Sequence, residues 1–185
     1  MGKLYDAIDA KVSEFIGAQK MFFVATAPLS AEGHVNLSPK GYDCLRILGP
    51  RTVAYQDLTG SGVETIAHLR ENGRITLLFC AFEGPPKLVR LHGHGHALEP
   101  GDEEYGSLAP LFPPHPSMRS IVRIQVERIS DSCGFSVPLY TFDGNRSQLD
   151  AWAAHKGPDG IARYQAEKNA TSIDGLPGLR RVTEG

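Results

Sequence analysis

The chain has 185 residues, of which 41% are hydrophobic, so it can bury a full core without disulfide or metal staples. It carries 19 Lys and Arg against 21 Asp and Glu, a formal net charge of −2, and its basic residues do not cluster, which argues against a nucleic-acid-binding module. No apolar run approaches the roughly 20 residues of a membrane-spanning helix, and the start of the chain lacks the pattern of a signal peptide.

The first predicted element is a helix over residues 4–18, because its apolar residues recur at the spacing of one helix face. Four short strands separated by turn residues are predicted next, over residues 21–27, 34–38, 44–48 and 52–57. A second helix is then expected to begin near Ser61. There Ser61 and Glu64 have the spacing of a capping box, and Asn72 and Gly73 end the helix.

Further strands are predicted in the second half of the chain, over residues 74–82, 87–98 and 120–129. In the last of them, Val122, Ile124 and Val126 alternate with polar residues, so one face is expected to enter the core. About seven short strands with few helices between them favour an antiparallel barrel of the mainly β (α+β) class.

The strand over residues 87–98 has a histidine at every second position, His92, His94 and His96, on the same face as Arg90. Its other face is small and apolar and should be the core side. Same-face residues lie about 7 Å apart along a strand, and three imidazoles in a row give poor tetrahedral geometry. We therefore expect the histidines on a polar face, and no native metal site.

The character of the sequence changes after residue 131. Two short helices are predicted there, over residues 147–157 and 159–170, followed by a tail whose scattered apolar residues favour packing over disorder. We predict a barrel domain over residues 1–130. A C-terminal extension over residues 131–185 is expected to pack on the barrel or on a second subunit.

The three cysteines, Cys44, Cys80 and Cys133, are widely spaced and odd in number. This pattern suits a reduced, cytoplasmic protein better than a disulfide framework. Cys80 lies in an apolar run, where a buried small side chain is a better reading than a reactive thiol.

Three phrases occur in a characteristic order: "HVNLSPKGYD", "VAYQDLTGSGVETIAHLRENGRITLLFCAF" and "KLVRLHGHG". Together with the predicted elements, they resemble the pyridoxamine 5′-phosphate oxidase-related family of FMN-binding split barrels. The resemblance covers roughly residues 5–130, and it is closer to the broad related family than to the vitamin B6 enzyme. It implies an antiparallel split β-barrel with peripheral helices and a C-terminal helical appendage.

Members of this family are homodimers, in which each barrel forms one wall of two FMN sites at the subunit interface. The resemblance therefore implies a homodimer, with the "NLSPKG" strand along the flavin and the "TGSG" turn on its ribityl-phosphate side. The residues it implies in cofactor binding are Asn36, Leu37, Ser38, Lys40, Tyr55, Gln56, Asp57, Ser61, Gly62, Thr65 and Arg90.

Elementary physics favours the same turn as a phosphate site, because the N–H groups and the dipole at a helix N-terminus attract anions. The resemblance breaks down at the start of this helix, where the B6 oxidase has two basic residues and this chain has Glu64 and Thr65. The candidates to neutralise the phosphate are therefore Lys40, Arg70 and Arg90. The arginines that hold the B6 oxidase substrate have no good match, so that substrate is not implied.

The resemblance implies an FMN-dependent oxidoreductase that transfers two electrons between the flavin and an unidentified small molecule. No catalytic side chain is assigned. Cys133 and Trp152 are candidates to line the open face of the flavin, although Trp152 is better explained as an anchor for its own short helix.

Four other functions stay open. One is a flavin store or sensor without a substrate, which no nicotinamide would reduce. Another is a split-barrel enzyme that uses the deazaflavin F420, whose acidic tail requires a basic groove that is not evident here. A third is a haem protein with His92, His94 or His96 as axial ligand, and a fourth is a metal-binding module that depends on the same strand.

Overall fold

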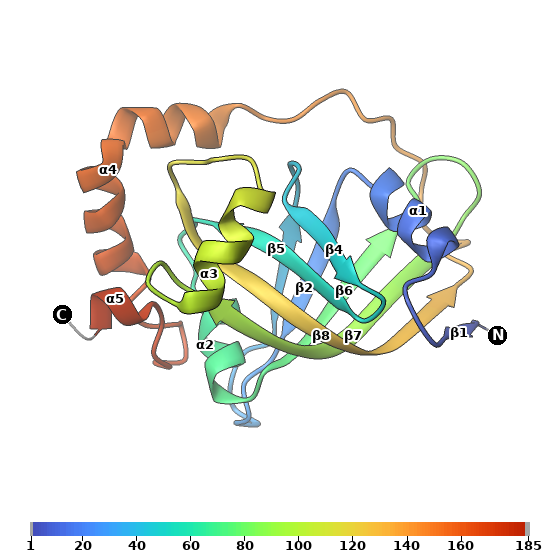
Figure 1. The fold of residues 1–185 in the computed structure, drawn as a ribbon, viewed down its shortest axis with the longest axis horizontal. Coiled ribbons are helices and arrows are strands. Elements are labelled where there is room, and N and C mark those ends of the chain that lie inside the picture. The colour runs from blue at the N-terminus through green and yellow to red at the C-terminus, as the bar shows by residue number, and fades with distance from the viewer. Residues whose placement is uncertain (1, 184–185) are drawn as a thin grey trace.

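The computed structural model describes residues 2–183, in which eight antiparallel strands form one sheet (Figure 1). The strands are β1 Leu4–Tyr5, β2 Phe22–Thr26, β3 Asn36–Lys40, β4 Leu45–Gly49, β5 Thr52–Leu58, β6 Arg74–Cys80, β7 Leu88–Leu98 and β8 Met118–Ser132. Their order in the sheet is β3-β2-β6-β7-β8-β5-β4, and β1 pairs with β8. The sheet curls around one core, and β3 and β4 are its two edges.

The helices lie around the barrel (Figure 1). They are α1 Ala10–Ala18, α2 Glu64–Glu71, α3 Glu103–Leu108, the 3-10 turn η1 Ala109–Leu111, α4 Gln148–Lys168 and α5 Arg180–Thr183. None of the helices within residues 2–183 combines the length and apolarity needed to cross a bilayer.

The barrel core confirms the predicted alternation in β8, since Val122, Ile124 and Val126 are buried while Gln125 and Glu127 are exposed. The core also takes in the apolar face of α1 and alternate residues of the other long strands. The antiparallel split barrel expected from the sequence is therefore confirmed. It has one strand more than the seven predicted, because β1 was not foreseen.

The prediction of a first helix over residues 4–18 is wrong in its first half. Leu4 and Tyr5 pair with β8, and α1 begins only at Ala10. Asp9 caps the helix, because its Oδ1 accepts a hydrogen bond from the N–H of Val12 at 2.8 Å. The pairing with β8 is a contact between distant parts of the chain, which helical spacing alone does not reveal.

The predicted capping box at α2 is also wrong. The residue before the helix is Val63, which makes no side-chain cap, and Ser61 lies in the exposed turn before it. The Oε1 atom of Glu64 accepts a hydrogen bond from the N–H of Ile173, 3.3 Å away. The Glu64 carboxylate, which a capping box would direct to the backbone of residue 61, is therefore hydrogen-bonded to the C-terminal tail instead.

The extension after β8 packs on the barrel. Its extended first part crosses one edge of the molecule before α4 begins (Figure 1). The two helices predicted there are confirmed as the two halves of α4, which bends at Gly157, where φ is 63°, next to Pro158. In the tail, Leu179 is fully buried against Val63 and Ile66 of the α2 region.

Candidate functional site

A hydrogen-bonded cluster joins β3 to the start of α2. The Nδ2 group of Asn36 donates to the hydroxyl of Thr65 at 2.9 Å and to that of Thr26 at 3.1 Å. The hydroxyl of Ser38 donates in turn to Oδ1 of Asn36 at 3.0 Å. Three of the residues expected to bind the cofactor, Asn36, Ser38 and Thr65, are thus held together.

The cluster extends into the core through His68, whose Nδ1 lies 2.9 Å from the hydroxyl of Thr26. That hydroxyl accepts a hydrogen bond from Asn36 and can donate its own proton to Nδ1 of a neutral His68 ring that carries its proton on Nε2. Burial lowers the pKa of His68, which favours this neutral form. Its Nε2 group has no hydrogen-bond partner among the described residues.

A buried ion cluster lies beside the same strand. The carboxylate of Asp57 accepts hydrogen bonds from Lys40 Nζ at 2.9 Å and from Arg119 Nε at 2.7 Å. Burial by itself would raise the pKa of Asp57, but the Arg119 and Lys40 charges hold it well below its usual value. Two cations therefore share one carboxylate, and the cluster keeps a net positive charge.

Arg119 also fixes the turn that precedes α2. Its Nη1 donates to the carbonyl of Gly62 at 2.8 Å, and the side chain of Asn169 donates to the carbonyl of Gly60 at 3.0 Å. In a trans peptide the following N–H points away from the carbonyl, so the N–H groups of Ser61 and Val63 face away from Arg119 and Asn169. Within residues 2–183 neither N–H has a hydrogen-bond acceptor, as an anion site requires.

None of the three cations considered from the sequence for the phosphate is free to face this turn. Lys40 is held by Asp57, Arg70 is paired with Glu99, and Arg90 donates to the hydroxyl of Ser132 on β8. The cation behind the turn is Arg119, which is only 4% exposed. Arg119 lies just before the predicted strand over residues 120–129, and no local pattern marks it as a functional residue.

The other expected cofactor residues are placed less directly. Tyr55, Gln56 and Asp57 are buried in β5, and Tyr55 packs edge-on against Phe22, with no hydrogen-bond partner for its hydroxyl in the described part of the chain. Leu37, in contrast, is 65% exposed on the outer face of β3. Among the residues of the turn, Ser61 and Gly60 are exposed and Gly62 is half-buried.

The histidine strand faces outward as predicted, with Val89 and Leu91 on its core side. His92 Nδ1 lies 3.1 Å from the hydroxyl of Thr76, and His94 Nδ1 lies 2.9 Å from Glu127. Both histidines line a groove of about 460 Å³. Across residues 2–183, no group of three or more His, Cys, Asp or Glu side chains is placed to hold a metal ion.

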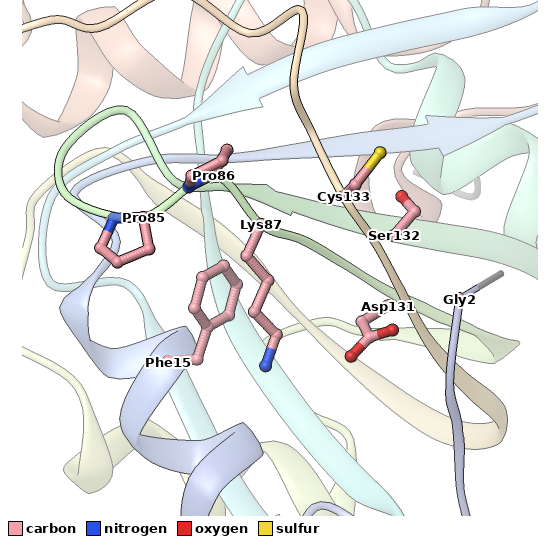
Figure 2. A pocket seen from close by; sticks show the side chains of 8 residues that line it. All are labelled: Gly2, Phe15, Pro85, Pro86, Lys87, Asp131, Ser132 and Cys133. Atoms are coloured by element: carbon pink, nitrogen blue, oxygen red, sulfur yellow. The ribbon is translucent and has the colours of Figure 1, made fainter.

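Cys133 and Trp152 do not line a common surface. Figure 2 shows Cys133 at the rim of a cavity of about 670 Å³, beyond the end of β8 and near Lys87 and Phe15. Trp152 lies on α4 and packs edge-on against Tyr164 of the same element. This ring contact of Trp152 is thus within α4 rather than with the barrel, and the role of these two residues at a flavin face stays a prediction.

A second cavity, of about 520 Å³, has four aromatic side chains in its walls and is called the aromatic cavity here. Phe23 and Phe82 come from the barrel, and Tyr140 and Phe142 come from the extension, which is attached to the barrel by the hydrogen bond from the N–H of Tyr140 to the carbonyl of Phe82 at 2.9 Å. Phe23 pairs with Pro39 of β3, so this aromatic cavity adjoins the end of β3 opposite Asn36.

Comparison with known proteins agrees with this architecture. A family model described as pyridoxamine 5′-phosphate oxidase matches residues 8–133. The chain is 36% identical, over 192 residues, to the pyridoxamine 5′-phosphate oxidase family protein ustO of Aspergillus flavus, and the match covers 95% of this chain and 77% of that protein.

Two crystal structures share the fold. HupZ of Group A Streptococcus has a TM-score of 0.53 and 22% identity, with 72% of this chain and 99% of that chain covered. A Clostridium acetobutylicum protein of the pyridoxinephosphate oxidase family, related to general stress protein 26 of B. subtilis, has a TM-score of 0.53 and 16% identity, with 75% and 94% covered. At these identities the two structures support the fold alone.

Proposed function

This chain belongs to the pyridoxamine 5′-phosphate oxidase family, and we propose that it is an FMN-binding flavoprotein and an oxidoreductase acting on a small molecule. The observation that carries the proposal is the 2.9 Å hydrogen bond between Asn36 and Thr65. It joins the strand and the helix start that the family resemblance assigns to the flavin, which lie far apart in the sequence.

The turn before α2 suits the phosphate end of FMN. Among residues 2–183 the N–H groups of exposed Ser61 and buried Val63 have no acceptor, the hydroxyl of Ser61 is exposed, and the charge of Arg119 lies behind the turn. Glu64, which stands where a basic residue was expected, has its carboxylate hydrogen-bonded to the N–H of Ile173. Backbone groups and a buried cation thus take the place of the missing basic pair.

The remaining expected residues divide into two groups. We place Asn36, Leu37, Ser38 and Thr65 next to the flavin, and Arg90 on the outer face of the barrel towards its ring. The buried residues Tyr55, Gln56 and Asp57, and the half-buried Lys40 that is paired with Asp57, support them from inside the barrel.

The flavin would supply the chemistry, a two-electron transfer to or from a small organic molecule. The residues of this chain bind and orient it: the Asn36 cluster fixes β3 against α2, and the Arg119 cluster supplies positive charge. We propose that a second copy of the chain completes the site as a homodimer in the cytoplasm. The aromatic cavity beside Pro39 is then the place for an apolar substrate.

This function is tested by titrating the protein with FMN and measuring binding through the quenching of flavin fluorescence. The wild type should bind one FMN per chain. Asn36→Leu should weaken binding about tenfold or more, because the hydroxyls of Thr26, Ser38 and Thr65 lose their partner and the link from β3 to α2 is broken. Asn145→Leu, the same change at an exposed position, should have no effect. Equal affinity in all three proteins would contradict the site.

Reduction by nicotinamides separates an enzyme from a flavin store. The FMN-loaded protein is mixed anaerobically with NADH or NADPH, and the visible flavin bands are followed. Bleaching of these bands faster than that of free FMN supports an oxidoreductase. If neither nicotinamide reduces the bound flavin, storage or sensing becomes the better reading while FMN binding itself stands.

A further inference from the structure

The turn before α2 is completed by a part of the chain outside residues 8–133, the segment that the family model matches. The contributing residues are Asn169, which follows α4, and Gln165, one helical turn earlier. Both are buried, and Asn169 is fully enclosed. They lie more than 100 residues away in the sequence from the turn they contact.

The side-chain amide of Asn169 both accepts and donates a hydrogen bond. Its Oδ1 accepts a hydrogen bond from Arg119 Nη1 at 3.0 Å, and its Nδ2 donates to the carbonyl of Gly60 at 3.0 Å. Gln165 adds a bond from its Nε2 to the hydroxyl of Thr59 at 2.7 Å. A carboxylate could not donate and an aliphatic side chain could do neither, so an amide is the group that fits between the arginine and the carbonyl.

The position of Asn169 is itself fixed by the tail. Its carbonyl accepts a hydrogen bond from the N–H of Leu179 at 2.9 Å, and Gly178 lies so close that a side chain there would collide with that carbonyl. Leu179 is buried against Val63, the last residue before α2. The tail therefore returns to the turn that Asn169 holds.

We propose that Asn169 is a positioning residue for the phosphate of the flavin, and that the C-terminal extension is in this way a working part of the cofactor site. Through Gly60 it turns the N–H of Ser61 outward, while Arg119 does the same for Val63 through Gly62. This inference rests on the proposed FMN site. It adds that selectivity for a phosphorylated flavin depends on the extension.

FMN and riboflavin differ only in the phosphate, so the pair isolates this role. Dissociation constants of both are measured by fluorescence quenching on the full chain for the wild type, Asn169→Ala and Arg163→Ala. Arg163 is exposed on α4 and makes no hydrogen bond or ion pair among the described residues, so it is the matched control. Asn169→Ala should weaken FMN binding about three- to tenfold and leave riboflavin unchanged.

Several results would overturn the inference: an unchanged FMN affinity in Asn169→Ala, an equal loss for both flavins, or a wild type that binds the two flavins equally well. If Asn169→Ala does not fold, Gln165→Ala provides the same comparison. It removes the bond to Thr59 and the bond that Gln165 accepts from Arg181, leaves Asn169 in place, and should give a smaller loss for FMN alone. A wild type that binds neither flavin would reject the proposed function itself. A wild type that binds FMN more tightly than riboflavin would support the proposed function, whatever the affinities of the variants.

Discussion

Lys40 and Asp57 join two strands that share no hydrogen-bonded ladder. Lys40 ends β3, one edge of the sheet, and Asp57 lies in β5, next to the other edge strand, β4. Their atoms Nζ and Oδ1 are 2.9 Å apart, so the ion pair crosses the split in the barrel. Arg119 reaches the same carboxylate from β8, which links the split to the candidate phosphate turn.

Asp57→Asn should destabilise the protein by about 3–5 kcal/mol at pH 7, because it leaves Lys40 and Arg119 without their buried partner. Urea unfolding measures this loss. Asp43→Asn is the control, since its ion pair with Arg46 is largely exposed and should contribute about 1 kcal/mol or less. A loss at Asp57 as small as that at Asp43 would contradict the buried cluster.

The same carboxylate should make the fold sensitive to acid. The pKa of Asp57 is lower in the folded protein than in the unfolded chain, where it is about 4. The contribution of this carboxylate to stability is therefore complete above about pH 4 and is lost as the pH falls towards the folded-state pKa. The stability difference between the wild type and Asp57→Asn should therefore narrow below about pH 4. A difference that stays constant from pH 7 to pH 3 would show that the carboxylate is not held in this way.

His68 should add a second loss of stability at milder pH. Burial lowers its pKa in the folded protein, so protonation favours unfolding as the pH falls below the unfolded value of about 6.5. Between pH 7.5 and pH 5.5 the wild type should lose more stability than His68→Gln, which cannot titrate. The other six histidines are the same in both proteins, so parallel losses would exclude this role for His68.

The tail should behave as part of the fold. Leu179 is fully buried against Val63 and Ile66, so Leu179→Ala should cost about 2–5 kcal/mol in unfolding free energy. Ile173 lies in the same tail but is 70% exposed, and Ile173→Ala should change stability by about 0.5 kcal/mol or less. Similar values for the two variants would mean that the tail does not pack on α2.

Local patterns were enough to predict most of the barrel. Alternation located β8 and the core side of the histidine strand, and Gly157 with Pro158 separated the two halves of α4. The pattern misled at the start of the chain, where Leu4 has helical spacing with Ile8 but pairs, together with Tyr5, with β8. Their position depends on a strand more than 120 residues away, which no local rule contains.

The candidate site was predictable in its strand and its turn but not in what holds the turn. Asn36, Ser38 and Thr65 lie in segments that carry the family resemblance, and the structure brings them together. Arg119 and Asn169 were missed, because each contacts the turn across 50 residues or more. A lone buried arginine or asparagine is recognisable only when its partners are known.

The most direct test of the central claim is the visible absorption spectrum of the purified, untagged protein, with and without added FMN. Denaturation afterwards releases any chromophore for identification. We predict flavin bands shifted from those of free FMN and one FMN released per chain at saturation. A colourless protein whose spectrum after mixing is that of free FMN would contradict the account, and the histidine groove would then become the leading candidate site.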